Sequence, residues 1–416
     1  MQLIFRDALV YTNGSVEKQT VLFDGSSFSP IASFDGASFS FGEAAVIDNT
    51  AIFPGLCDVH VHFREPGFSY KETVKGGCEA AAAGGYTAVM TMPNLNPTPD
   101  SVENLKVQLD IIERDAKIHV APYATITVSE AGERLSDMEG LSKYVLAFTD
   151  DGKGVQNDTV MARAMKKAAE NGKIIAAHCE DNSLLLGGYI HDGEYAHLHG
   201  HRGISSASEY EQLKRDIELL SKNPCKYHVC HVSTKESVEL IRNAKKQGID
   251  ITAETGPHYL LLTDMDLKEE GRFKMNPPLR SREDRDALIE GILDGTIDMI
   301  ATDHAPHSGE EKSRGLEKST MGVVGLETAF PIMYTYFVKK GLLSLERLIE
   351  LMSIAPRRRF GINADSGVTV YSLSDEYKID SEKFHGSGRA TPFDGLDVCG
   401  KTLLTVHNGE VVYKNI

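Results

Sequence analysis

Four histidines and two aspartates in this sequence have the types and spacing of ligands in a metal centre that holds two ions. His60 and His62 follow an apolar run and are separated by one residue, so on a strand they would share one face and could bind one ion together. The other candidates also follow apolar runs, and they are Asp151, His178, His231 and Asp303. One catalytic zinc usually has three protein ligands and a water. Six candidate ligands therefore indicate two ions, about 3.5–4 Å apart.

The types of these residues suggest how they would divide between two ions. The histidine pair and Asp303 would hold the first ion, and His178 and His231 would hold the second. A carboxylate from the sequence Thr149-Asp-Asp-Gly152, either Asp150 or Asp151, would bridge them. Coordination lowers the pKa of water to about 7, so a hydroxide between two Zn²⁺ ions is a nucleophile near neutral pH. The expected chemistry is hydrolysis at a carbonyl carbon, or its reverse.

Arg64 lies two residues beyond the histidine pair, where the predicted strand gives way to a loop. Its guanidinium can form a bidentate pair with a carboxylate, which indicates an anionic substrate. Two strand histidines alone are equally compatible with ordinary buried polar groups. Packing does not explain why the ends of five predicted strands carry His or Asp.

The central part of the chain alternates apolar runs, typical of buried strands, with helical patterns. The predicted helices include 101–114, 158–171 and 234–247, the last capped by Ser233 or Thr234. The predicted strands are 51–63, 86–92, 117–123, 144–148, 173–178, 226–231, 250–254 and 296–301. About eight such units predict a (β/α)8 barrel of the TIM type, in which the carboxyl ends of the strands form the active site. A doubly wound open sheet is the alternative, and no Gly-x-Gly-x-x-Gly follows the first strand to support its dinucleotide-binding form.

Both ends of the chain are rich in short β-like runs separated by turn signals. Asn13-Gly14 and Asp24-Gly25 are typical of hairpins. We therefore expect one small β domain, built from residues 1–50 and 362–416, beside a barrel of residues 51–361.

The composition excludes several classes of function. The formal net charge of −16 disfavours nucleic acid as a partner, because binding phosphates requires a basic surface. No apolar run of about 18 residues predicts a membrane-spanning helix, and the first residues do not resemble a signal peptide. The six cysteines contain no C-x-x-C pair and are typical of reduced thiols. We expect a cytoplasmic enzyme with a small-molecule substrate.

Six motifs, in this order, give the chain a specific resemblance. They are Asp58-Val-His-Val-His-Phe-Arg-Glu-Pro-Gly67, Phe148-Thr-Asp-Asp-Gly152, Ala177-His-Cys-Glu180, His228-Val-Cys-His-Val-Ser-Thr234, Met275-Asn-Pro-Pro-Leu-Arg280 and Ala301-Thr-Asp-His-Ala-Pro-His307. Over roughly residues 50–360 the chain resembles the dihydroorotases, in particular the long bacterial branch of this group within the amidohydrolase superfamily. The reaction of that family is the reversible cyclisation of N-carbamoyl-L-aspartate to L-dihydroorotate in pyrimidine synthesis.

The resemblance implies a role for each candidate ligand. His60, His62 and Asp303 match ligands of a first zinc, and His178 and His231 match those of a second. Asp151, rather than Asp150, matches the bridging ligand, together with a hydroxide. Many superfamily members use a carboxylated lysine there, which a carboxylate makes unnecessary. Asp303 would also be the general acid/base, passing a proton between the hydroxide and the ring nitrogen.

The resemblance also implies how the substrate binds. Arg64, Asn94 and His307 would bind the carboxylate that does not react. Asn276 and the backbone of Met321-Gly322 would hold the pyrimidine ring. The polar segment 308–320 would be either a mobile lid or an ordinary solvated loop.

Other polar residues receive no catalytic role. We expect Asp58 to support His60 from behind and His228 to face away from the site, and no role is assigned to His258. A polar loop is expected to carry a further group of histidines, which are His191, His197, His199 and His201.

Two alternative functions stay open. One is another cyclic amidase, namely a hydantoinase, dihydropyrimidinase or allantoinase. The other is a non-catalytic, dihydroorotase-like partner of aspartate transcarbamoylase, although such proteins lose metal ligands that this chain retains. For an active enzyme we expect a homodimer, with association with aspartate transcarbamoylase as an additional option.

Overall fold

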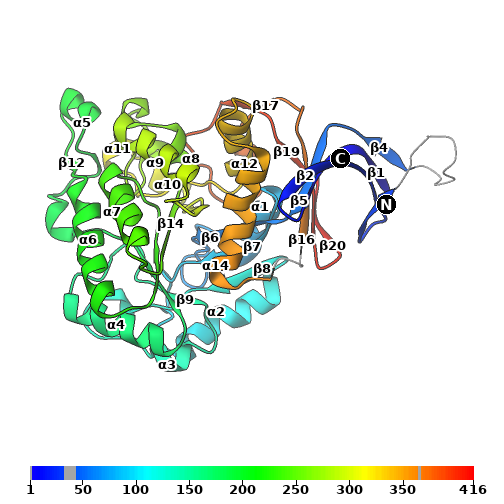
Figure 1. Cartoon of the computed structure of the whole chain (residues 1–416). Coiled ribbons are helices and arrows are strands. Elements are labelled where there is room, and N and C mark those ends of the chain that lie inside the picture. Colours follow the sequence, from blue (N-terminus) through cyan, green and yellow to red (C-terminus); the bar gives the residue numbers. More distant parts are fainter. Residues whose placement is uncertain (1, 32–43, 364–366) are drawn as a thin grey trace.

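A closed ring of eight parallel strands forms the centre of the computed structural model, which describes residues 2–31, 44–363 and 367–416 (Figure 1). The strands are β6 (Leu56–Val61), β7 (Tyr86–Thr91), β8 (His119–Pro122), β9 (Ala147–Phe148), β10 (Ile174–Ala177), β13 (Lys226–Val229), β14 (Ile251–Thr255) and β15 (Met299–Ile300). A three-stranded and a five-stranded group meet at two parallel bridges, Ala124–Phe148 and Val61–His304. These bridges close the ring, which confirms the predicted (β/α)8 barrel.

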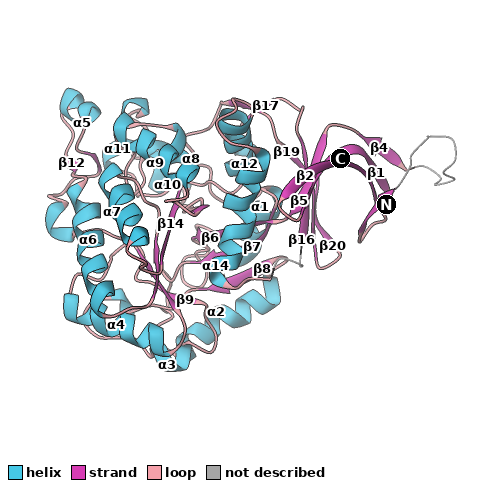
Figure 2. Cartoon of the chain, in the orientation of Figure 1, coloured by secondary structure: helices cyan, strands magenta, loops and turns pink. Residues whose placement is uncertain are grey.

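Helices cover the outside of this ring (Figure 2). The longer ones are α1 (Val74–Ala83), α2 (Val102–Asp115), α4 (Asp158–Glu170), α6 (Ala207–Lys222), α7 (Lys235–Lys246) and α9 (Arg282–Asp294). Thr234, one of the two residues predicted as the cap of α7, does cap it: its hydroxyl accepts a hydrogen bond from the backbone N–H of Ser237. The apolar face of α7 buries Val238, Ile241 and Ala244 against the barrel.

Shorter elements connect and extend the barrel. The short helices are α3 (Met138–Leu141), α5 (Glu194–His199), α8 (Pro257–Leu261), α10 (Gly309–Lys312), α11 (Gly315–Lys318), α12 (Ala329–Met333), α13 (Leu345–Ile349) and α14 (Ala355–Phe360). Two small sheets pair β11 (Ile190–His191) with β12 (Gly203–Ile204) and β17 (Tyr377–Lys378) with β18 (Asp397–Val398). None of the helices in the described ranges is long and apolar enough to cross a membrane.

A separate sheet beside the barrel combines strands from both ends of the chain (Figure 1). Its strands are β1 (Leu3–Thr12), β2 (Ser15–Phe23), β3 (Phe28–Ile31), β4 (Ala45–Ile47), β5 (Thr50–Pro54), β16 (Gly367–Ser372), β19 (Lys401–His407) and β20 (Glu410–Lys414). Thr12 pairs with Ser15 across the predicted Asn13-Gly14 turn, in which both central residues have positive φ. Strand β16 pairs with β5, so the two ends of the chain meet inside one sheet.

The predicted strand 51–63 is wrong as one element, because the chain divides it between the two sheets. Residues Thr50–Pro54 pair with β16 in the flanking sheet, and Leu56–Val61 begin the barrel. Gly55 lies between them, where a Cβ atom would approach the Thr87 hydroxyl oxygen to 2.2 Å. Only glycine fits this close approach of backbone to side chain.

Candidate active site

A pocket of about 270 Å³ opens at the carboxyl ends of the barrel strands. Its walls contain His62, Arg64, Asn94, Asp151, Gly152, His178, His231, Asn276, Asp303, Ala305, His307, Met321 and Gly322. Every residue predicted for the site is among them except His60, which is fully buried. Residues separated by some 250 positions in the sequence thus share one small volume.

The ends of the strands position the candidate ligands. His60 lies in β6, and His178 directly follows β10. His231 and Asp303 follow β13 and β15 and have positive φ, 32° and 46°. Residues other than glycine rarely adopt this backbone region, and such strain is common where a site fixes a side chain.

Asp151 lies at the centre of the four histidines. Its Oδ1 is 3.4 Å from His60 Nε2 and 3.5 Å from His231 Nε2. Its Oδ2 is 3.5 Å from His62 Nε2, and its Oδ1 is 3.7 Å from His178 Nδ1. Each carboxylate oxygen therefore faces imidazole nitrogens, and the residue lies between the two histidine pairs.

Asp150 points the other way, into the loop that follows β8. Its carboxylate accepts hydrogen bonds from the backbone of Ile126 and Thr127, at 2.8 and 3.0 Å, and from the Thr127 hydroxyl. Burial raises its pKa to about 6. Lys153, the nearest lysine that follows, is half-exposed and extends toward Glu130, 3.6 Å away. The geometry therefore places Asp151, and neither of these neighbours, among the histidines.

The remaining ligand candidates form two close pairs. Asp303 Oδ1 lies 3.1 Å from His62 Nε2 and 3.5 Å from His60 Nε2. His178 Nδ1 lies 2.9 Å from His231 Nε2. Burial alone would raise the pKa of Asp303, but the imidazoles of His60 and His62 lower it below its ordinary value. Asp303 thus lies with His60 and His62, and His178 lies with His231.

The donor set fits a bound cation. His60, His62 and Asp303 present ligand atoms within 4.8 Å of one another, and so do His60, Asp151 and His231. Within the described part of the chain, His60 Nε2 and Asp151 Oδ1 are buried without a hydrogen-bond partner. Unpaired buried polar atoms are costly unless another group, such as a metal ion, satisfies them. The residues therefore fit the metal centre that the sequence predicts.

Glu254, at the end of β14, supports the site and was missed by the sequence analysis. Its carboxylate is 1% exposed, with Oε1 2.7 Å from His60 Nδ1 and Oε2 3.0 Å from His228 Nε2. A carboxylate can only accept, so His60 Nδ1 donates and its Nε2 is left to face Asp151 and Asp303. His228 does not line the pocket, but it points toward Glu254, so the expectation that it faces away needs this correction. A lone acid in an apolar strand was the available signal.

Replacing Glu254 by Gln is expected to lower metal affinity about 10- to 100-fold, because a neutral amide orients His60 less firmly and makes it a weaker ligand. Titration of the metal-depleted protein with zinc against a competing chelator measures this. Glu209→Gln is the matched control, since Glu209 is equally buried but binds only the backbone and hydroxyls of Ser233 and Thr234. Equal zinc affinity of the Glu254 variant and the wild type would show that Glu254 does not orient His60 for metal binding.

Arg64 lies in the pocket, and among the described residues no carboxylate forms an ion pair with it. Its Nε donates to the carbonyl of Pro306 at 3.3 Å, and Nη2 is 3.5 Å from His307 Nε2. Burial lowers its pKa to about 10, so it is still a cation at neutral pH. Within the described residues no ion pair joins Arg64 to an acid, which leaves its charge available to an anionic ligand.

Two other predicted contacts are fixed by neighbours. Asn94 Nδ2 donates to the carbonyl of Asp151 at 2.7 Å, and Asn276 Nδ2 donates to Glu180 Oε1 at 2.9 Å. The other oxygen of Glu180 lies 3.4 Å from His178 Nε2. Glu180, which the sequence analysis quoted without assigning a role, thus joins a candidate ligand to a candidate substrate contact.

The second group of histidines lies outside the pocket. His197 is exposed and 3.1 Å from Asp192. The expected solvated loop is wrong for His191, which is buried in β11 with its Nδ1 3.3 Å from Arg280 Nη1. His197 and His199 lie in helix α5 and not in a loop. Asp58 behaves as expected of a supporting residue, because it accepts hydrogen bonds from the backbone of His60 and of Thr302.

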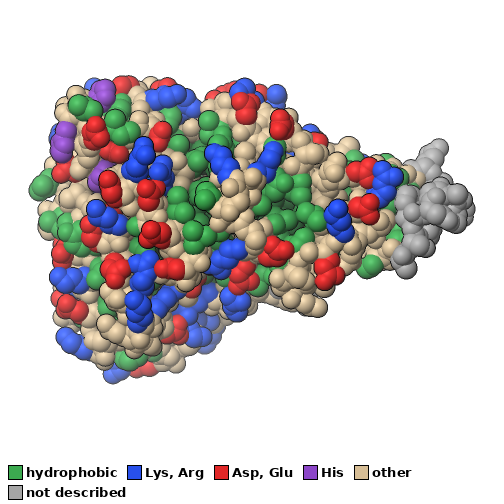
Figure 3. All heavy atoms as spheres, turned by 45° about the horizontal axis from the view of Figure 1, so that its top comes forward, with side chains coloured by type: hydrophobic (Ala, Val, Ile, Leu, Met, Phe, Trp, Pro, Cys, Tyr) green, Lys and Arg blue, Asp and Glu red, His purple; other side chains and the backbone are tan. Residues whose placement is uncertain are grey.

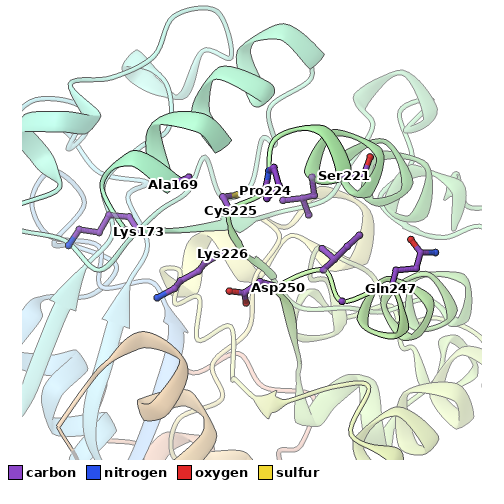
Figure 4. Close-up of a pocket in the computed structure, with 12 residues that line it drawn as sticks. Ala169, Lys173, Ser221, Pro224, Cys225, Lys226, Gln247 and Asp250 are labelled. Atoms are coloured by element: carbon purple, nitrogen blue, oxygen red, sulfur yellow. The ribbon is translucent and has the colours of Figure 1, made fainter.

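A larger pocket, of about 590 Å³, lies at the other end of the barrel (Figure 4). Lys173, Lys226 and Asp250 line it and immediately precede or begin β10, β13 and β14. The site residues follow the carboxyl ends of the strands instead. The larger pocket is therefore remote from the histidine cluster.

Comparison with known proteins identifies the family of the chain. A family model described as dihydro-orotase-like matches residues 49–237. A curated dihydroorotase of Fusobacterium nucleatum is 48% identical over 99% of this chain and 98% of its own length. One of Bacillus licheniformis is 47% identical, again over 99% of this chain and 98% of its own length. The chain belongs to the dihydroorotase family. This confirms the resemblance noted from the six motifs.

Solved structures with a similar fold come from neighbouring enzymes. The L-hydantoinase (dihydropyrimidinase) of Arthrobacter aurescens has a TM-score of 0.84 at 26% identity and covers 99% of this chain and 96% of that chain. The dihydropyrimidinase of Brevibacillus agri, at 22% identity and a TM-score of 0.82, shows a likeness of fold alone. The dihydroorotase-family chain therefore has the fold of these cyclic amide hydrolases.

Proposed function

We propose that this chain is a dihydroorotase that interconverts N-carbamoyl-L-aspartate and L-dihydroorotate in pyrimidine (UMP) biosynthesis. Full-length identity of 47–48% to curated dihydroorotases supports the reaction class. The observation that carries the substrate is Arg64, a buried cation in the same pocket as the histidine cluster. L-Dihydroorotate has a ring carboxylate to pair with it, whereas hydantoin does not.

For the cofactor we propose two zinc ions in each chain. His60, His62 and Asp303 would hold the first ion, and His178 and His231 the second. Asp151, together with a hydroxide, would bridge them, because its two oxygens face both histidine pairs. When bound, the ions supply an activated water and polarise the carbonyl of the substrate.

Asp303 would move the proton. In hydrolysis its carboxylate accepts the proton of the attacking water and delivers it to the ring nitrogen as the C–N bond breaks. In cyclisation the same group removes the proton from the carbamoyl nitrogen, as microscopic reversibility requires. The lowered pKa of Asp303 keeps it ionised and able to accept at neutral pH.

Arg64, Asn94 and His307 would bind the carboxylate that does not react, with Arg64 supplying the charge. Asn276 and the backbone of Met321 and Gly322 would contact the ring. The buried side-chain oxygen of Asn276 has no partner among the described residues, so it is available to accept a hydrogen bond from a ring N–H of the substrate. His307 Nε2 lies 2.8 Å from the carbonyl of Met321, which joins the two groups of contacts.

Replacing Arg64 by Met is expected to raise KM for L-dihydroorotate about 10- to 100-fold, since a hydrogen bond to a charged group contributes about 1.5–3 kcal/mol. Steady-state kinetics measures this. Dihydrouracil, the same ring without the carboxylate, is the control substrate, and its KM should not rise. Metal content is measured in parallel, because Arg64 Nη1 also lies 3.3 Å from His62 Nδ1. An unchanged KM for L-dihydroorotate would refute the assigned role of Arg64.

The function itself is tested by one comparison of substrates. Purified protein, loaded with zinc, is given L-dihydroorotate, hydantoin and allantoin separately. We expect turnover of L-dihydroorotate to dominate. Turnover of hydantoin with none of L-dihydroorotate would instead favour the hydantoinase alternative. A solved L-hydantoinase has a similar fold.

Several further properties are proposals that follow from the function. A non-catalytic partner of aspartate transcarbamoylase is disfavoured, because all six candidate ligands are retained. We propose a cytoplasmic homodimer, with association with aspartate transcarbamoylase as an additional option. Light scattering of the protein alone tests the dimer, and light scattering with aspartate transcarbamoylase added tests the association. Acidic and basic side chains are interspersed over the face in Figure 3, which supports the absence of a nucleic-acid partner. The expected domains are 1–50 with 362–416 and 51–361; we propose to move the first boundary to residue 54, because β5 (Thr50–Pro54) belongs to the flanking sheet.

A further inference from the structure

We propose that Lys312 is a positioning residue for the substrate ring, because its ammonium group fixes the backbone that forms the ring side of the pocket. This inference rests on the proposed function, which assigns ring contacts to Asn276, Met321 and Gly322. Lys312 does not line the pocket itself and would act through those residues.

The surroundings of the Lys312 ammonium are unusual for a lysine. The residue is 8% exposed and is the last of α10. Its Nζ donates to three backbone carbonyls, those of Lys274 at 3.0 Å, Thr320 at 2.8 Å and Gly322 at 2.7 Å. An ammonium has three N–H donors, so the three carbonyls satisfy all of them.

No carboxylate compensates this charge within the described part of the chain, where the ion pairs of the structure do not include Lys312. Burying a cation without a counter-ion is costly. An apolar side chain of similar length would avoid that cost if packing alone mattered here. Burial lowers the pKa of the Lys312 amine to about 7, and the three backbone carbonyls are the groups that accept its hydrogen bonds.

Of the three carbonyl-bearing residues, Gly322 lines the pocket, and Thr320 and Lys274 lie one residue before Met321 and two before Asn276, which also line it. Gly322 is itself a proposed ring contact, and its backbone N–H donates to the carbonyl of Lys274 at 3.0 Å. Lys274 lies two residues before Asn276, so one ammonium group fixes the spacing of two ring-binding segments. The carbonyl of Met321 in turn accepts a hydrogen bond from His307 Nε2.

Gly322 shows how tightly this wall is packed. Its φ is +132°, and a Cβ atom there would lie 2.8 Å from the carbonyl oxygen of Ala305 and 3.0 Å from His307 Nε2. A small shift of the Gly322 backbone would thus reach both the ring contacts and the His307 side chain.

Segment 308–320, predicted to be either a lid or a solvated loop, folds around Lys312. It forms α10 and α11, with Ser308 as the cap of α10. The Ser319 hydroxyl donates to the carbonyl of Lys312, and the backbone of Thr320 donates to Glu311. Lys312 is the inner anchor of this segment, which connects His307 to Met321.

The test compares two buried lysines, neither of which lines the pocket. Lys312→Met is expected to raise KM for L-dihydroorotate about 10-fold, as three carbonyls lose a charged donor, while kcat changes less than about 3-fold because the proposed metal ligands are untouched. Lys274→Met is the matched control, since its Nζ donates to the carbonyl of Glu317 and to none of residues 320–322. Its KM should change by less than about 3-fold.

Chemical rescue separates charge from packing. Lys312→Cys, alkylated with 2-bromoethylamine, regains an ammonium at nearly the original length, and Lys312 borders a second pocket of about 430 Å³ through which the reagent can reach it. Wild-type protein treated in the same way controls for Cys225, which is partly exposed. We expect alkylation to restore KM, and this variant also replaces Lys312→Met if the latter does not fold.

Two results would overturn the proposal: an unchanged KM in folded Lys312→Met, or a raised KM in Lys312→Cys that alkylation does not restore. Failure of the wild type to turn over L-dihydroorotate would instead refute the proposed function.

Discussion

Asp303→Asn is expected to lower kcat for L-dihydroorotate about 1,000-fold, within the range that general acid–base catalysis contributes. The amide has the shape of the carboxylate but cannot accept the proton of the attacking water. Because one group serves both directions, hydrolysis and cyclisation should fall by the same factor. Steady-state kinetics in both directions, with zinc in excess, measures this.

A second aspartate beside the same strand provides the control. Asp298 precedes β15, whereas Asp303 follows it, and Asp298 pairs with Lys245 at 2.7 and 2.8 Å, away from the pocket. Asp298→Asn should leave kcat within about 2-fold of the wild type, because a partly exposed ion pair contributes only about 1 kcal/mol or less to stability. Metal content is measured for both variants, since Asp303 is also a proposed ligand. A folded, metal-loaded Asp303→Asn that retains more than a tenth of wild-type activity would contradict its role in proton transfer.

The position of the site could be predicted because local pattern and barrel topology agree. His178 and Asp303 each follow a short apolar run, and such a run predicts a buried strand. In a barrel of parallel strands all carboxyl ends meet at one mouth, so residues at these ends converge whatever their separation in the sequence. No knowledge of side-chain packing was needed for this step.

The supporting residues could not be predicted, because their roles depend on contacts across the barrel. Glu254 meets His60 only because β14 and β6 both face the barrel interior, 194 residues apart. Lys312 lies in a polar segment, and only the folding of that segment onto Lys274 and Gly322 buries it. The local sequence pattern shows that these side chains are polar, whereas the tertiary structure decides whether they are buried.

At Gly55 the boundary between two strands also depends on tertiary contacts and could not be predicted from local pattern. The run from Ala51 to Cys57 is apolar on both sides of Pro54-Gly55, which gave the only sign of a break. Packing against Thr87 decides where one sheet ends and the other begins.

Asp151→Ala is expected to lower zinc affinity at both proposed sites by more than about 100-fold, since loss of even an outer partner of a metal ligand costs about 10- to 100-fold. Oδ1 of this carboxylate faces His60 and His231, and Oδ2 faces His62. Its removal takes a ligand from both ions and leaves the imidazoles without a central negative charge. Metal content after dialysis should fall well below two ions per chain, and activity should fall with it.

The adjacent Asp150→Asn variant makes this result specific to one carboxylate. An asparagine oxygen there can still accept hydrogen bonds from the backbone of Ile126 and Thr127, so we expect a loss of about 1 kcal/mol in stability and full metal content. Both aspartates are buried neighbours, so a nonspecific effect of removing a charge would lower metal content in both variants. Loss of zinc from Asp150→Asn with retention in Asp151→Ala would identify Asp150 as the bridge and reverse the assignment.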